Sequence, residues 1–198
     1  MNYIAHIHIA NHTQTSLLGN FLGDFVKGSS LIHLPKELAI GVKLHRKVDS
    51  FTDNHELVKN LRKMFPRELR RVAGIIIDIT FDYLLMQQWD GLTLQTKEQV
   101  LTRFYHQLSV FDGIDTHHFK RLSHSLVTDR WLLEYQQADT CLRAMKSIER
   151  RLNNKIIFAD TAYVFFLANL PEFETTFTAF YPELLIHGVH YSQQLRSI

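Results

Sequence analysis

Apolar residues recur every three or four positions through most of the chain, and stretches that alternate apolar with polar residues are few. This spacing gathers apolar side chains on one face of an α-helix. Glycine and proline, which interrupt helices, number only 8 and 4 among 198 residues. The pattern predicts an all-α protein, a single compact multi-helix domain that spans residues 1–198.

Capping residues and prolines indicate where the predicted helices begin and end. Ser16 is a suitable N-cap, Gly28 suits the position after a helix, and Pro35, Pro66 and Pro171 suit first turns. Residues 1–14 fit either an extended piece or an early helical turn. Further side-chain caps are predicted at Asp53 with Glu56, Thr96 with Gln99, Thr128, and Asp139 or Thr140. The expected helices cover roughly 17–27, 35–50, 54–65, 66–89, 97–110, 119–126, 131–137, 140–152, 156–170 and 171 onward, the last with a kink near Pro182.

Composition and charge narrow the class of protein. Lysine and arginine number 22 against 20 aspartates and glutamates, so the net charge of +2 does not by itself indicate nucleic-acid binding. Cys141 is the single cysteine, which rules out an intrachain disulfide. The first residues lack a basic and apolar leader, and the most apolar run, Ile75–Met86, is too short to span a bilayer. We therefore expect a cytoplasmic protein that is not bound to a membrane.

One stretch, Leu44–Asp53, combines residues suited to a metal and a phosphate. His45 and Asp49 are four residues apart and share a helix face, and Arg46 is one position over. The alternative is an ordinary solvated, charged helix end. The 12 histidines of the chain weakly favour metal or acid–base chemistry.

Two carboxylates interrupt the most apolar run. Asp78 and Asp82 are again four residues apart, and an ionised carboxylate is costly to bury without a partner. The partner is either a metal or an arginine or lysine from a neighbouring helix, unless the carboxyl group keeps its proton.

Together the residues that interrupt apolar faces suggest one metal site. They are all nitrogen or oxygen ligands, which suit Mn, Fe, Mg or Zn without selecting among them. A metal held in this way, with Arg46 on the phosphate, predicts metal-assisted hydrolysis of a phosphate ester. The predicted metal ligands are His6, Asp24, His45, Asp49, Asp78 and Asp82.

Several motifs in a fixed order resemble the acyl carrier protein phosphodiesterases, which remove 4′-phosphopantetheine from holo-acyl carrier protein. The motifs run over most of the chain: Met1–His6, Gly19–Val26, Gly41, Leu44–Asp53, Arg71–Ala73, Asp78 with Asp82, Trp131–Leu133 with Tyr135, and Met145 with Arg150–Leu152.

The resemblance implies a fold similar to HD-domain phosphohydrolases, a divalent metal that is typically manganese, and a metal site lined by the six residues above. Asp24, His45 and Arg46 would carry the catalysis, with His45 or His6 either binding the metal or moving a proton. The chain departs from the family pattern at Tyr83, where the family usually has histidine.

The resemblance also implies an acidic protein substrate, since acyl carrier proteins are small and strongly acidic. Residues 59–71 carry six basic side chains against Glu68 alone, a charge layout that would steer an acidic partner. The alternative is a solvated helix face. The predicted partner-binding residues are Arg62, Lys63, Arg67, Arg70 and Arg71.

Two rival functions stay open at this stage. One is a metal-dependent phosphohydrolase that acts on a nucleotide or small phosphate ester. The other is a non-catalytic module that binds a carrier protein, for which Tyr83 would be the marker. The sequence leaves the oligomeric state open.

Overall fold

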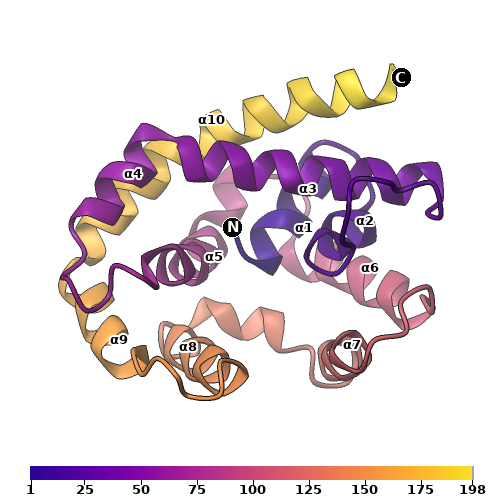
Figure 1. Ribbon diagram of the computed structural model, residues 1–198. Coiled ribbons are helices and arrows are strands. Elements are labelled where there is room, and N and C mark those ends of the chain that lie inside the picture. Colours follow the sequence, from indigo (N-terminus) through magenta and orange to yellow (C-terminus); the bar gives the residue numbers. More distant parts are fainter. Residues whose placement is uncertain (198) are drawn as a thin grey trace.

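The computed structural model describes residues 1–197, which fold into helices joined by turns with no strand in that range (Figure 1). The all-α prediction is therefore confirmed, while the likeness to HD-domain phosphohydrolases and the single-domain assignment stay predictions. The helices are α1 Tyr3–His12, α2 Leu17–Phe21, the 3₁₀ helix η1 Leu22–Asp24, α3 Lys36–Asn54, α4 Glu56–Lys63, α5 Ala73–Leu92, α6 Lys97–Ser109, α7 His117–Asp129, the 3₁₀ helix η2 Trp131–Gln136, α8 Asp139–Arg151, α9 Ala159–Ala168 and α10 Leu170–Arg196.

Helix α1 is the centre of the molecule, which settles the choice that the sequence left open for residues 1–14. Residues Ile4 to Ala10 are all buried, histidines included. Figure 1 shows α3, α4 and α10 on one side of α1, α5 beside it, and α7 and α8 on the other side. The buried apolar side chains form one hydrophobic core, whose first and last residues in the sequence are Ile4 and Leu195. Among residues 1–197, no helix combines the length and the hydropathy that crossing a membrane requires.

Several predicted helix bounds are wrong. The helix that starts at Leu17 ends at Phe21 and tightens into η1 instead of reaching Lys27. Residues 66–72 form turns, so the helix expected from Pro66 starts only at Ala73. The core helix predicted from Ile156 starts at Ala159. A proline permits a first turn without requiring one, and the packing of neighbouring elements decides the start.

The caps are partly as predicted. Ser16 accepts a hydrogen bond from the Gly19 N–H at 2.9 Å, and Thr96 with Gln99 forms the expected capping box.

Three predicted caps are wrong. Asp53 lies inside α3 and binds Arg62 at 2.6 Å, while His55 caps α4. Thr128 belongs to α7, and no side chain caps α8, so neither Asp139 nor Thr140 has that role.

Two glycines let α2 and α3 cross with their backbones in contact. A Cβ placed on Gly41 would lie 2.6 Å from the Gly19 carbonyl carbon and 2.7 Å from the Asn20 nitrogen. A Cβ on Gly19 would lie 2.8 Å from the Leu38 oxygen. Any side chain at either position would force α2 and α3 apart. This shift would also separate Asp24, which follows α2, from His45 on α3.

Candidate metal centre

Two imidazoles and a carboxylate from helices α1 and α3 lie close together. His6 Nε2 lies 3.1 Å from Asp49 Oδ1, and His45 Nε2 lies 3.1 Å from Asp49 Oδ2. The rings of His6 and His45 stack with centroids 3.8 Å apart. Ligand atoms of these three residues all lie within 4.8 Å of one another, a spacing that allows them to hold one metal ion.

The local sequence explains how the three side chains come together. His45 and Asp49 share one face of α3 through their spacing of four residues, as predicted. His6 reaches them from the buried helix α1. Gly23 makes room for the His45 ring, because a Cβ there would lie 2.1 Å from His45 Cγ.

The protonation states suit a metal ligand set. Burial, with the neighbouring His45, lowers the pKa of His6 to about 4, so its imidazole is neutral at neutral pH. Burial opposes ionisation of Asp49, but the imidazoles and the Met1 amine outweigh it and hold the pKa of that carboxyl well below its usual range. The neutral imidazole of His6 and the ionised carboxylate of Asp49 are the forms that bind a divalent metal.

An orphaned nitrogen supports the fit. His6 Nε2 is buried and has no well-formed hydrogen bond within residues 1–197, although Asp49 Oδ1 lies 3.1 Å away. A buried polar atom without a partner is costly, and a metal ion would remove that cost. The Nδ1 atoms of His6 and His45 are buried without partners in the same range, so the outer hydrogen bonds that usually orient metal-bound imidazoles are absent from these two rings.

Asp24 lies at the edge of this cluster. Its Oδ1 is 3.8 Å from His45 Nε2, and the residue is exposed. The carboxylate therefore borders the three buried or half-buried ligands on the side that solvent reaches.

Asp78 faces the cluster through the amine of Met1. The amine nitrogen lies 3.0 Å from Asp78 Oδ1 and 3.4 Å from Asp49 Oδ1. Burial raises the pKa of Asp78, and the amine offsets part of that effect. Burial lowers the pKa of the amine, but the two carboxylates outweigh it and raise the value to about 10. Neither an arginine nor a lysine among the described residues pairs with Asp78, contrary to the ion-pair alternative.

Asp82 has a structural role that the sequence did not suggest. Its two carboxylate oxygens accept hydrogen bonds from the N–H groups of Ile4 and Ala5, at 2.9 and 3.0 Å. The side chain therefore caps the N-terminus of α1, whose own N-cap residue, Asn2, makes no side-chain cap. Burial raises the pKa of Asp82 to about 7, against the opposing effect of these two hydrogen bonds. With both oxygens engaged, we do not include Asp82 among the proposed ligands.

Arg46 makes a hydrogen bond to the backbone of the segment that follows η1. Its Nη2 donates to the carbonyl oxygen of Val26 at 2.9 Å, which ties α3 to the segment that follows Asp24. Its predicted contact with a phosphate stays a prediction.

Tyr83, the departure from the family pattern, is half-buried and packs edge-on against Phe166 of α9, with ring centroids 5.8 Å apart.

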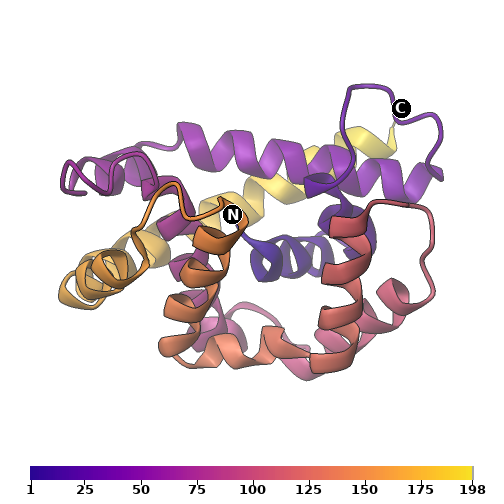
Figure 2. The same ribbon diagram turned by 60° about the horizontal axis from the view of Figure 1, so that its bottom comes forward.

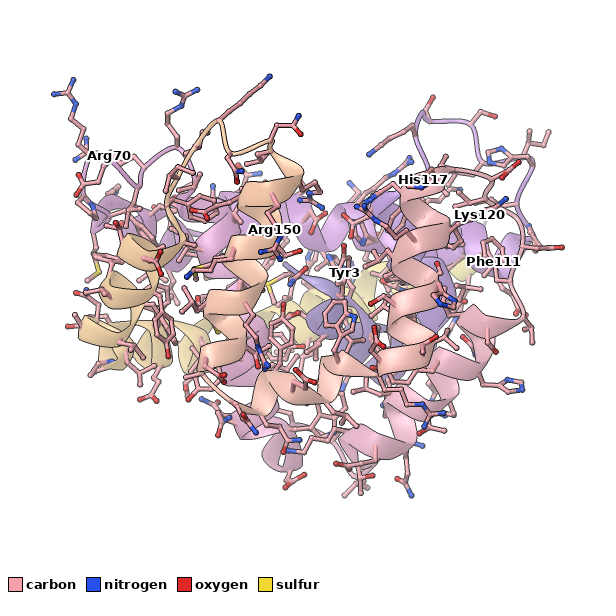
Figure 3. The ribbon with its side chains drawn as sticks, turned by 90° about the horizontal axis from the view of Figure 1, so that it is seen from below. Tyr3, Arg70, Phe111, His117, Lys120 and Arg150 are labelled. Carbon is pink, nitrogen blue, oxygen red and sulfur yellow. The ribbon has the colours of Figure 1, made fainter. Side chains whose placement is uncertain are left out.

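The predicted partner-binding residues lie around the turn from α4 to α5. Arg62 is half-buried and bound to Asp53, and Arg70 donates to the Phe65 carbonyl at 3.3 Å. The others, Lys63, Arg67 and Arg71, are exposed. Figure 3 shows Arg70 at the outer end of the molecule, away from Tyr3. Their contact with a partner stays a prediction.

A cleft of about 980 Å³, which the sequence did not predict, is lined by the residues that border the cluster and not by His6, His45 or Asp49 themselves. Asp24 and Asp78 line it together with Tyr3 and arginines of α7 and α8. Figure 2 shows the ribbons of α7 and α8 facing each other and joined by η2, and Figure 3 shows Tyr3 between them. Its lining comes from segments more than a hundred residues apart, at positions that read as ordinary exposed faces of amphipathic helices.

Comparisons with known proteins agree with the motif order. The family model for acyl carrier protein phosphodiesterase matches residues 1–184. The chain is 30% identical over 191 residues to the acyl carrier protein phosphodiesterase of Shigella boydii, covering 96% of this chain and 98% of the relative. It is 31% identical over 186 residues to the protein of that name from Escherichia coli O6:K15:H31, covering 93% and 96%. No solved structure matches the chain.

Proposed function

The chain belongs to the acyl carrier protein phosphodiesterase family, and from this premise we propose that it hydrolyses holo-acyl carrier protein to apo-acyl carrier protein and 4′-phosphopantetheine with a divalent metal. Water adds to the phosphorus, the bond from phosphorus to the carrier serine oxygen breaks, and that oxygen takes up a proton. Acyl carrier protein is the substrate that the names of the relatives state.

The observation that carries the metal requirement is the meeting of His6, His45 and Asp49. These three residues would hold the ion, and the remaining positions would be open to substrate and water, as in other catalytic metal sites. A bound divalent cation lowers the pKa of water and neutralises charge on a phosphoryl oxygen. We propose manganese, on the family resemblance; the nitrogen and oxygen ligands suit Mg²⁺, Fe²⁺ and Zn²⁺ as well.

The other residues have roles that follow from their positions. Asp24, exposed to the cleft and 3.8 Å from His45, is placed to accept a hydrogen bond from the attacking water. Asp78 and Asp49 hold the Met1 amine beside the ligands. The stacking of His6 on His45 restricts the rotation of both rings, so that their Nε2 atoms stay 3.1 Å from the Asp49 carboxylate.

The test is intact-mass spectrometry of holo-acyl carrier protein incubated with the protein. We expect loss of the phosphopantetheine mass with Mn²⁺ and no loss with chelator. Asp49→Asn should slow the reaction by more than about 100-fold, the upper end for loss of a residue that only supports a metal ligand. Asp53→Asn is the matched control, because Asp53 lies on the same helix, is exposed and binds Arg62.

The remaining outcomes separate the rivals. Cleavage of small phosphate esters without cleavage of the carrier protein would favour the small-ester phosphohydrolase. Binding of carrier protein without turnover under any divalent metal would favour the binding module. Equal loss of activity in Asp49→Asn and Asp53→Asn would refute the proposed metal site.

A further inference from the structure

Three arginines face the cleft without a carboxylate partner among residues 1–197. They are Arg121 on α7 and Arg150 and Arg151 in the last turn of α8. Arg143, which also lines the cleft, differs, because it binds Glu134 at 2.9 Å. Guanidinium groups that line a cavity without an anion are available to a ligand that supplies one.

Arg121 and Arg151 lie near the residues that border the metal cluster. Burial, together with the charge of Asp24, raises the pKa of Tyr3 to about 12 against the opposing charge of Arg151, so both charges act on the Tyr3 hydroxyl. Burial lowers the pKa of His118, and the charges of Arg151 and Arg121 lower it further while Asp24 opposes them. Arg121, Arg151 and Asp24 all line the same cleft, in which Figure 3 shows Tyr3 between α7 and α8.

The end of α8 is held in place by a buried glutamate. Glu149 accepts hydrogen bonds from the N–H groups of Phe158 and Ala159, at 2.5 and 2.6 Å, and so joins the last turn of α8 to the start of α9. Arg150 and Arg151 follow Glu149 directly, so their backbone is fixed although their side chains are exposed. Because this backbone is already ordered, binding of a ligand by these side chains does not have to order the backbone as well.

We propose that Arg121 and Arg151 form an anion subsite that binds the phosphoryl group of the substrate from opposite sides of the cleft, next to the metal cluster. The identity of that substrate rests on the proposed function. Two guanidiniums on different helices can each offer paired N–H donors to phosphoryl oxygens, which a single arginine cannot do from both sides. One N–H group of Arg46, by contrast, already donates a hydrogen bond to the Val26 carbonyl oxygen.

The test measures binding without turnover. We would titrate 4′-phosphopantetheine, and separately pantetheine without phosphate, into the protein by calorimetry, with Mn²⁺ and with chelator. Arg121→Ala and Arg151→Ala should each weaken binding of 4′-phosphopantetheine about tenfold, as expected for a hydrogen bond to a charged group. Binding of pantetheine should not change. Arg151→Lys should recover only part of the loss, because lysine keeps the charge and loses the planar pair of donors.

Arg103→Ala is the matched control, an exposed arginine on α6 that does not line this cleft and is not among the predicted partner-binding residues. Unchanged affinity for 4′-phosphopantetheine in the Arg121→Ala, Arg151→Ala double variant would overturn the subsite. Weakened binding of apo-acyl carrier protein with unchanged binding of 4′-phosphopantetheine would also overturn it, and would assign these arginines to protein carboxylates instead.

The subsite and the proposed function can fail separately. A wild-type protein that binds 4′-phosphopantetheine through Arg151 but cleaves no carrier protein would sink the proposed function and support the subsite. Full cleavage of the carrier protein at unchanged KM in the double variant would support the proposed function and overturn the subsite.

Discussion

Replacing Gly41 with alanine tests how the crossing of α2 and α3 places the site. The added Cβ would lie 2.6–2.7 Å from backbone atoms of Gly19 and Asn20, which cannot rotate away as a side chain can. Overpacking of this kind costs about 1–3 kcal/mol, and the rigid neighbours argue for the upper end. Alanine regains about 1 kcal/mol because it favours a helix interior more than glycine does. We expect Gly41→Ala to lower the free energy of unfolding by about 2 kcal/mol and Tm by about 4–8 °C.

The chain supplies a matched control for this substitution. Gly91, in the last turn of α5, has no heavy atom within 4 Å of the position where a Cβ would lie. Gly91→Ala keeps the propensity gain without the collision and should raise the stability by up to about 1 kcal/mol. Urea unfolding of both variants measures the difference, and Mn²⁺ affinity should fall only for Gly41→Ala. Equal stabilisation by the two substitutions would show that α2 does not depend on contact at Gly41.

Two further predictions concern buried titratable groups. Asp82→Ala leaves the N–H groups of Ile4 and Ala5 without an acceptor, so it should lower the free energy of unfolding by about 2–4 kcal/mol. The Mn²⁺ affinity of the folded protein should be unchanged. Unchanged stability together with lost Mn²⁺ binding would show instead that Asp82 is a metal ligand. Burial, with the neighbouring His12, lowers the pKa of His8 to about 3 in the folded protein. As pH falls below about 6.5, the histidine therefore binds a proton in the unfolded chain but not in the folded one. Between about pH 6.5 and 3, the free energy of unfolding of wild type should fall by up to about 1.4 kcal/mol per pH unit relative to His8→Asn. Parallel pH profiles of unfolding for wild type and His8→Asn would contradict a neutral, buried His8.

The sequence predicts local parts of the fold and site well. The pair His45 and Asp49 follows from helical spacing alone, and the capping box of Thr96 and Gln99 needs only residues three apart. His6 could be placed only through the family resemblance and the interruption of an apolar face. Such inferences succeed where the partners lie on one helix.

Contacts between distant segments were beyond that reasoning. The Asp82 carboxylate meets backbone N–H groups 77 and 78 residues away, and a backbone donor leaves no mark in the sequence. Arg121 and Arg151 occupy exposed positions on two separate helices, and only the fold turns both toward one cleft. Their residue types alone resemble those of any solvated helix.

The central place of α1 has a consequence for synthesis on the ribosome. Helix α1 is synthesised before the other described helices, yet its neighbours include α10, which follows them all in that order: Tyr181 is hydrogen-bonded to His8 at 2.9 Å, and Arg196 donates to the Thr13 carbonyl at 3.0 Å. Helix α1, which carries His6, is therefore not fully packed until α10 has been synthesised. A nascent chain halted before α10 would already contain His6, His45 and Asp49. It would lack the contacts of α10 that help to hold α1 in place.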